Sequence, residues 1–136
     1  MKKHAATLLI LMLVALTGLG FAQTRTIKAN VPFDFTVNGK TMPAGECRIN
    51  IADDGQRVLL VGSGVEHAYV LPTPTRSRDA SNETTLLFRQ YGDRYFLAEI
   101  NLEGSTGGYE LPKGKLEREL ARNTSETAVT LLASIE

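Results

Sequence analysis

The stretch that decides the fold is VPFDFTVNGKTMPAGECRI, residues 31–49. It continues an alternation that begins at Ile27, in which every second residue up to Val37 is apolar. Such alternation predicts a β-strand with one buried face and one solvated face. Pro32 falls inside this strand and cannot donate a hydrogen bond to a ladder. We therefore expect the strand to bend at Pro32 or to lie at the edge of a sheet.

Two turn signals divide the same stretch. Asn38 and Gly39 follow at the point where the alternation stops, and this pair tolerates the positive φ angles of a two-residue hairpin turn. Pro43 and Gly45 mark a second turn, in which Gly45 is expected to need a positive φ angle. The stretch is therefore predicted to be scaffold, made of a strand, a tight turn and a return strand.

Further alternating segments follow along the chain, each bounded by turn residues. They lie at residues 47–51, 57–61, 66–71, 84–91, 94–102 and 127–135. Short strands that recur about every eight to twelve residues are typical of a sandwich or a barrel. The sequence thus predicts an all-β, mainly antiparallel fold, either a small sandwich or a partly closed barrel.

One segment near the C-terminus has helical character. Residues 113–123 place Leu116 and Leu120 four apart on one face, and we expect this face to dock a short C-terminal helix on the sheet. Residues 72–83 are polar and carry two prolines, and residues 103–108 are rich in glycine. Both segments are predicted to be loops.

The N-terminal 22 residues have the pattern of a signal peptide. Lys2 and Lys3 precede a continuous apolar run, and Gly20 and Ala22 place small residues where signal peptidase cleaves. The run is shorter than the roughly 20 apolar residues that a spanning helix needs. We expect cleavage after Ala22, export to the periplasm or the medium, and a single β-rich domain over residues 23–136.

Composition narrows the classes of partner. The chain has 15 basic and 15 acidic residues, and removal of the N-terminal segment takes away two lysines. The near-neutral charge argues against nucleic acid, whose binding depends on neutralising phosphates. No cofactor is predicted, because residues 108–116 lack the spacing and the hydroxyl residue of a phosphate-binding loop. The single cysteine permits no internal disulfide, so packing alone must stabilise the domain.

Few side chains are candidates for chemistry. Cys47 shares a strand face with two isoleucines and is predicted to be a buried apolar filler. Adjacent positions in a strand face opposite ways, so His67 cannot form a dyad with Glu66. His67 shares its face with Tyr69 and Leu71, and this face is predicted to lie in the core or at an interface.

Two charged clusters have alternative interpretations. Arg76 and Arg78, with Arg89 and Arg94 further along the chain, could form an anion site or belong to a solvated loop. Asp53 and Asp54 could be paired carboxylates but are followed by glycine, as in many hairpin turns. The candidate binding residues are Arg76, Arg78, His67 and Tyr69, and no catalytic or metal-binding set is predicted.

Three blocks together resemble a family of small exported proteins that are abundant in Acidobacteria-like soil bacteria. They are residues 31–49, LLFRQYGDRYFLAEI at 86–100 and ELPKGKLERELA at 110–121. The resemblance covers most of the chain after the signal segment, and it implies export and a β-rich domain but no reaction. Cys47 stands where the family pattern has an aromatic residue, which argues further against thiol chemistry.

Two functions follow as hypotheses. The first is a non-enzymatic exported β-domain that binds a partner protein of the envelope or extracellular space, a glycan or a small apolar ligand. The second is a small hydrolase-like enzyme centred on His67 or on Asp53 and Asp54. A carboxylate within hydrogen-bond reach of His67 in a cleft would favour the enzyme.

Overall fold

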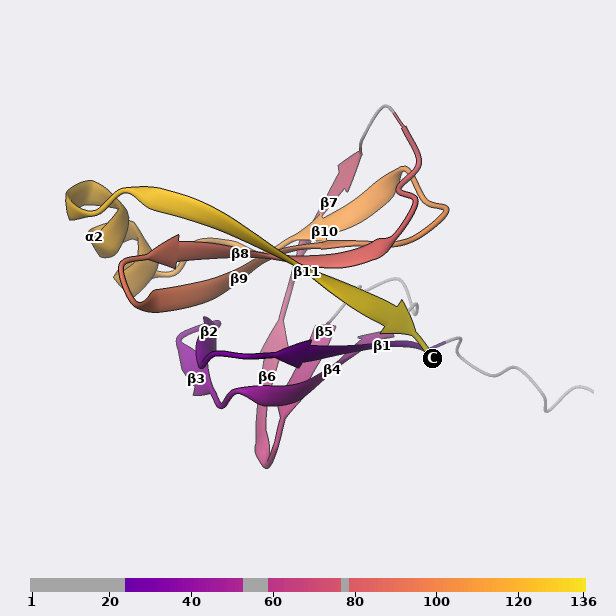
Figure 1. The fold of residues 1–136 in the computed structure, drawn as a ribbon, viewed down its shortest axis with the longest axis horizontal. Coiled ribbons are helices and arrows are strands. Elements are labelled where there is room, and N and C mark those ends of the chain that lie inside the picture. The colour runs from indigo at the N-terminus through magenta and orange to yellow at the C-terminus, as the bar shows by residue number, and fades with distance from the viewer. Residues whose placement is uncertain (1–23, 53–58, 77–78) are drawn as a thin grey trace, which may run out of the picture.

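The computed structural model describes residues 24–52, 59–76 and 79–136, which form eleven strands and one helix (Figure 1). The first strands are β1 (Thr24–Val31), β2 (Phe35–Val37), β3 (Lys40–Met42), β4 (Gly45–Ala52), β5 (Leu59–Ser63) and β6 (Glu66–Val70). The later elements are β7 (Thr73–Arg76), β8 (Thr84–Tyr91), β9 (Arg94–Asn101), β10 (Gly107–Glu110), α2 (Lys115–Asn123) and β11 (Glu126–Ile135). The predicted β fold with one short helix is confirmed.

The strands form one sheet that folds into a nearly closed barrel. The order is β3-β2-β9-β8-β11-β1-β4-β5-β6, and β10 pairs with both β9 and β7. Figure 1 shows two layers, with β8 and β9 in one, β1 and β4 to β6 in the other, and β11 crossing between them. β7 follows β6 along the chain and pairs with β10, which in turn pairs with β9. The chain therefore connects β6, at one end of the strand order, with the strands beside β9 near the other end. Among the named strands all pairings are antiparallel except the contact of β2 with β9, and an isolated bridge between Ser81 and Glu103 is also parallel.

The long alternating segment is divided at Pro32, as the sequence predicts. β1 pairs with β4 and β11, whereas β2 pairs with β3 and β9. The same face stays inward across the break, since Ile27, Val31, Phe35 and Val37 are all buried. The bend therefore lets one amphipathic segment serve two regions of the sheet.

The two turns after β2 and β3 have the backbone angles that their residues favour. Asn38 and Gly39 have φ angles of 49° and 77°, which confirms the two-residue hairpin turn. Gly45, with a φ of 132°, opens β4. In the second turn, Asp34 Oδ1 accepts a hydrogen bond of 2.8 Å from the Ala44 amide. This carboxylate thus connects the break after β1 to the start of β4.

Replacing Gly45 by valine is expected to destabilise the fold by about 1–3 kcal/mol. No atom lies within 4 Å of a Cβ at this position, so the cost comes from the φ angle rather than from a clash. Urea unfolding measures the loss. Ala44→Val, at the neighbouring exposed position, is the control and should stay within about 0.5 kcal/mol. Equal losses from the two variants would contradict the role of the φ angle.

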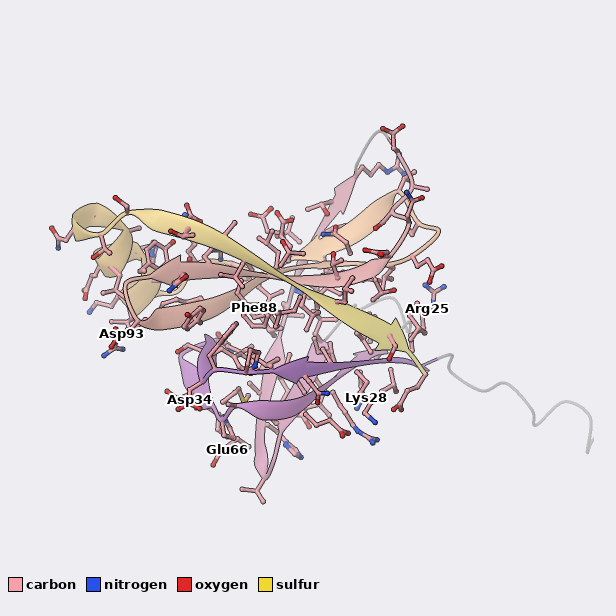
Figure 2. The ribbon with its side chains drawn as sticks, in the orientation of Figure 1. Arg25, Lys28, Asp34, Glu66, Phe88 and Asp93 are labelled. Atoms are coloured by element: carbon pink, nitrogen blue, oxygen red, sulfur yellow. The ribbon has the colours of Figure 1, made fainter. Side chains whose placement is uncertain are left out.

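Phe88 of β8 lies at the centre of the core, where the two layers face each other (Figure 2). Its ring packs edge-on against Phe33 and Phe35, at centroid distances of 5.1 and 5.4 Å. Phe33 also stacks on Tyr95 of β9. This aromatic cluster joins the bend between β1 and β2 to the opposite layer.

The helix contacts the sheet differently from the prediction. Leu116 is 43% exposed and Leu120 is half-buried, whereas Glu117 is only 2% exposed. The predicted leucine contact is therefore wrong, because the surface beneath α2 contains Arg89, and a buried guanidinium needs a carboxylate partner.

Two segments predicted as loops contain strands. β7 and β10 pair with each other, and β10 also pairs with β9. Both are short and contain glycine, proline or threonine rather than alternating apolar residues, so periodicity does not reveal them. Gly108 has a specific reason to be glycine, since a Cβ there would lie 2.8 Å from the carbonyl oxygen of Ile100.

The seam between β3 and β6 is closed by side chains instead of a backbone ladder. Asn38 Nδ2 donates to the Tyr69 carbonyl, and Lys40 Nζ donates to the His67 carbonyl, both at 2.9 Å. The Lys40 ammonium also lies 3.1 Å from the Glu66 carboxylate. The edge of β6 is thus covered where it would otherwise present free carbonyl groups.

Candidate functional site

The outer face of β4, β5 and β6 carries two cross-strand rows of side chains. The pairing register places Arg48, Gly62 and His67 in one row. The next row consists of Asn50, Leu60 and Tyr69. These residues alternate with the buried residues of the same strands, so they face solvent.

Gly62 leaves a groove in the middle of the first row. Without a side chain on β5 at this point, Arg48 and His67 form opposite walls of a hollow of about 360 Å³. Leu60 and Gly64 extend the floor along β5, and Glu46 and Asn50 complete the wall on β4. The hollow is in the size range of sites for small ligands.

The wall on β4 is electrically balanced. Arg48 Nε lies 2.8 Å from Glu46 Oε1, Lys28 Nζ lies 3.5 Å from Glu46 Oε2, and Arg48 Nη1 lies 3.9 Å from Glu136. The hydrogen bond from Arg48 holds the pKa of Glu46 below its ordinary value. The four side chains are exposed and carry two charges of each sign, so they position one another more than they stabilise the fold.

An exposed apolar border lies next to the groove. Tyr69 and Leu71 are 66% and 68% exposed, and Val65 in the preceding turn is 92% exposed. The prediction that His67 and Tyr69 share one face is confirmed by the strand register. Of the two predicted environments for this face, the core is excluded because both side chains are exposed, and an interface stays a prediction. Both faces of β6 carry apolar residues, and the barrel buries Ala68 and Val70 instead.

Of the predicted arginine cluster, the structure describes Arg76, Arg89 and Arg94, and it places these three in different parts of the fold. Arg76 is exposed at the end of β7, beside a polar hollow of about 550 Å³ that Asp79 and Glu99 also line. Arg89 is buried under α2 and paired with Glu117, and Arg94 is exposed at the start of β9. Arg78, like Asp53 and Asp54, lies outside the described residues.

The carboxylates on the strands next to His67 are engaged elsewhere. Glu46 is bound to Arg48, and Glu66 is bound to Lys40. His67 itself is exposed at the groove wall. The arrangement can donate and accept hydrogen bonds, but it does not present the oriented acid and base pair of a hydrolase.

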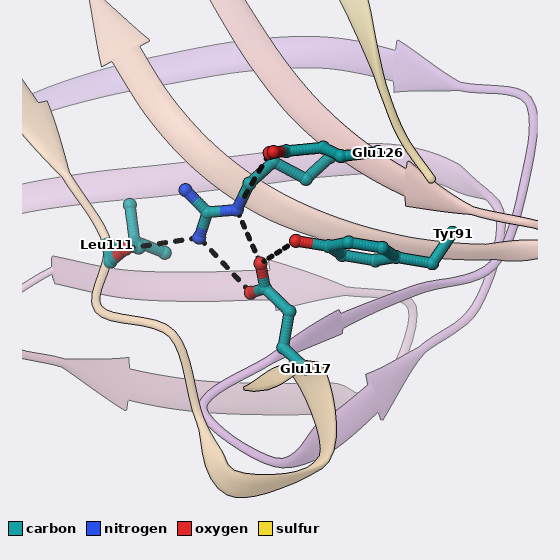
Figure 3. A network of polar contacts seen from close by, with 5 residues as sticks. Tyr91, Leu111, Glu117 and Glu126 are labelled. Atoms are coloured by element: carbon teal, nitrogen blue, oxygen red, sulfur yellow. Dashed lines mark hydrogen bonds and ion pairs between the residues drawn. The ribbon is translucent and has the colours of Figure 1, made fainter. Parts of the chain in front are cut away.

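Arg89, Tyr91 and Glu117 form a buried polar network that the sequence analysis did not identify (Figure 3). Arg89 donates to both carboxylate oxygens of Glu117, at 2.5 and 3.1 Å, and to the Leu111 carbonyl at 3.3 Å. Tyr91 donates to Glu117 at 2.9 Å.

Burial and the contact with Glu117 raise the pKa of Tyr91 to about 12, so its hydroxyl stays protonated at neutral pH. Every member of the network is paired and excluded from solvent. Its role is therefore to fix α2 on β8. The sequence carries one sign of this network. Arg89 and Tyr91 lie two residues apart, and so on one face, in a strand that was predicted from its apolar residues.

Cys47 is buried, as predicted, and burial raises the pKa of its thiol to about 12. At neutral pH the folded protein therefore contains almost no thiolate, which is the reactive form. We expect iodoacetamide to leave Cys47 unmodified in the native protein and to alkylate it in urea, as followed by mass spectrometry. Thr41→Cys places a thiol on an exposed strand position and serves as a reactive control. Equal labelling of both thiols in the native protein would contradict the burial argument.

The described residues contain neither a cluster of metal ligands nor a membrane-spanning helix. Within residues 24–52, 59–76 and 79–136, no three side chains of the metal-binding types come together. The one helix in these ranges, α2, is neither long nor apolar enough to cross a membrane. Comparison with protein-family models, curated proteins and solved structures finds no match to this chain. Function is therefore argued from the site itself.

Proposed function

We propose that this chain is an exported, non-enzymatic binding domain of the periplasm or extracellular space, with its ligand site in the groove on the outer face of β4 to β6. The observation that carries the proposal is the gap at Gly62, which opens a hollow between Arg48 and His67 beside the exposed Tyr69. Export rests on the sequence pattern of residues 1–22.

Three properties of the groove support binding. It combines an apolar floor with polar walls, which is the composition of most small-ligand sites. It lies on paired strands, which hold their side chains more firmly than a loop does. It borders Tyr69, Leu71 and Val65, which are exposed to water. Covering these apolar side chains with a bound partner would be favourable.

The hydrolase hypothesis has weaker support in its form centred on His67, while Asp53 and Asp54 lie outside the described residues. A general base needs a carboxylate or another group to orient it. The carboxylates on the neighbouring strands, Glu46 and Glu66, are paired with Arg48 and Lys40. A hydrolytic activity that His67→Gln abolishes in folded protein would restore this hypothesis.

The binding proposal is tested by ¹H–¹⁵N spectra of the purified protein mixed with fractionated envelope extract from the native host. Some fraction should shift the amides of Arg48, Gly62 and His67. Gly62→Val should remove the shifts by filling the groove. A Cβ at this position meets His67 Nδ1 at 3.5 Å and the Arg48 carbonyl oxygen at 3.8 Å, which are ordinary contacts, so β5 accepts a side chain here. The two further methyl groups of valine displace the His67 ring, and the dispersion of the same spectra checks that the variant is folded.

Thr130→Val is the control, since it places the same residue, valine, at an exposed position of β11 instead. It should keep the wild-type shifts. Shifts that persist in Gly62→Val, or that appear only outside β4 to β6, would show that the groove is not the site. Export is tested separately by the mass of the protein from the native host, which should begin at Gln23 and not at Met1.

A further inference from the structure

The walls of the groove offer hydrogen-bond donors and acceptors within a short distance of one another. Arg48 donates only, Glu46 accepts, Asn50 can do both, and the ring nitrogens of His67 add further hydrogen-bonding atoms. An apolar ligand would leave these groups unpaired at a cost in affinity. The ligand must therefore carry several groups that both donate and accept, as hydroxyls do.

The charge of the groove argues against an anion. Glu46 and Arg48 are joined at 2.8 Å, and Lys28 and Glu136 extend the cluster with one further charge of each sign. A phosphate or carboxylate approaching Arg48 would compete with Glu46 and be repelled by it. An uncharged ligand can add hydrogen bonds without breaking the ion pair.

The dimensions fit one flat ring. Neighbouring strands lie about 4.8 Å apart, so the backbones of β4 and β6 are about 9.6 Å apart on either side of Gly62. The His67 imidazole reaches to within 3.5 Å of the Cβ position of Gly62 and so takes up one side of this width. A single six-membered ring can lie in the rest of the hollow, with one edge directed at Arg48 and the other at the imidazole. The C–H face of a pyranose suits this apolar floor, and its equatorial hydroxyls suit the two walls.

The second row extends the site in one direction. Asn50, Leu60 and Tyr69 lie two residues along the strands from the first row, a distance of about 6.8 Å. Tyr69 is 66% exposed and can pack its ring against a second sugar, because aromatic faces bind apolar surface while remaining compatible with nearby polar groups. A linked second ring would therefore meet a different type of contact from the first.

We infer that the groove binds a neutral carbohydrate of at least two rings, the first held over Gly62 between Arg48 and His67 and the second against Tyr69. The inference rests on the proposed function, that this groove is the ligand site. It names the ligand class, and it assigns Tyr69 to the second ring and Gly62 to the first.

The test is an NMR titration of the purified protein with two monosaccharides, glucose and N-acetylglucosamine, and with their disaccharides at millimolar concentration. The disaccharides are cellobiose and maltose for glucose and N,N′-diacetylchitobiose for N-acetylglucosamine. We expect at least one disaccharide to shift the amides of β4 to β6 and to bind about tenfold more tightly than the monosaccharide. Gly62→Val should abolish binding of both. Tyr69→Ser should reduce the affinity for the disaccharide and leave that for the monosaccharide nearly unchanged. Thr130→Val should behave as the wild type.

The outcomes separate this inference from the proposed function. If no sugar binds but an envelope fraction still shifts the wild type and not Gly62→Val, the ligand class is wrong and the binding site stands. If that fraction contains only protein, the groove is a protein interface. Shifts of the groove amides by inorganic phosphate alone would identify an anion site instead. If neither sugars nor any fraction act through Gly62, both proposals fail.

Discussion

Replacing Glu117 by alanine is expected to destabilise the protein by about 3–5 kcal/mol, because it leaves the Arg89 guanidinium buried without its carboxylate. The side chains of Arg89 and Glu117 are only 8% and 3% exposed, so water cannot replace the lost partner without opening the helix. Tyr91 would lose its acceptor as well. The free energy of unfolding in urea measures the effect.

Two further variants give this prediction its controls. Glu119→Ala removes an exposed carboxylate from the same helix and should cost no more than about 0.5 kcal/mol. The double variant Arg89→Met with Glu117→Leu replaces both charges by apolar groups and should recover most of the loss. A double variant as unstable as Glu117→Ala alone would mean that packing of α2, and not the unpaired charge, explains the effect.

The second large effect is expected from Phe88→Ala, at about 3–5 kcal/mol. Phe88 is fully buried where the two layers meet, and its ring contacts Phe33 and Phe35. The substitution therefore removes apolar contacts and leaves a cavity that the paired strands cannot close. Thermal and urea unfolding should agree on the loss.

Two milder substitutions provide the comparison with Phe88→Ala. Phe88→Leu keeps much of the volume and should cost clearly less than Phe88→Ala. Phe33→Ala, at a half-buried ring of the same cluster, should also cost less. Similar losses for all three variants would contradict the cavity argument.

The strands with alternating sequence could be predicted, and the two missed strands show why others could not. β1, β2 and β4 bury one face, and their sequences record this as a period of two. In β8 a register shift between Leu87 and Phe88 interrupts this period. β7 and β10 are specified mainly by the neighbours they pair with, through contacts that are distant in sequence. Such strands leave little local signal, apart from a glycine such as Gly108 that permits close approach.

The site was predictable only in part. Alternation correctly put His67 and Tyr69 on one face, but it could not tell which face the barrel buries. The groove depends on Gly62 standing beside Arg48 and His67, which requires the register of three strands. The Arg89–Glu117 pair likewise joins residues 28 positions apart, and only the packed fold brings them together.

The seam between β3 and β6 bears on whether copies of the protein associate through their sheets at high concentration. A strand from a neighbouring copy could extend the sheet by pairing with the backbone of β6, which ends one side of the strand order. At this edge the carbonyls of His67 and Tyr69 are already occupied, and the Lys40 ammonium stands in the path of an incoming chain. A lysine and an asparagine thereby protect this edge of the sheet from pairing with another copy, and they do so without adding a strand.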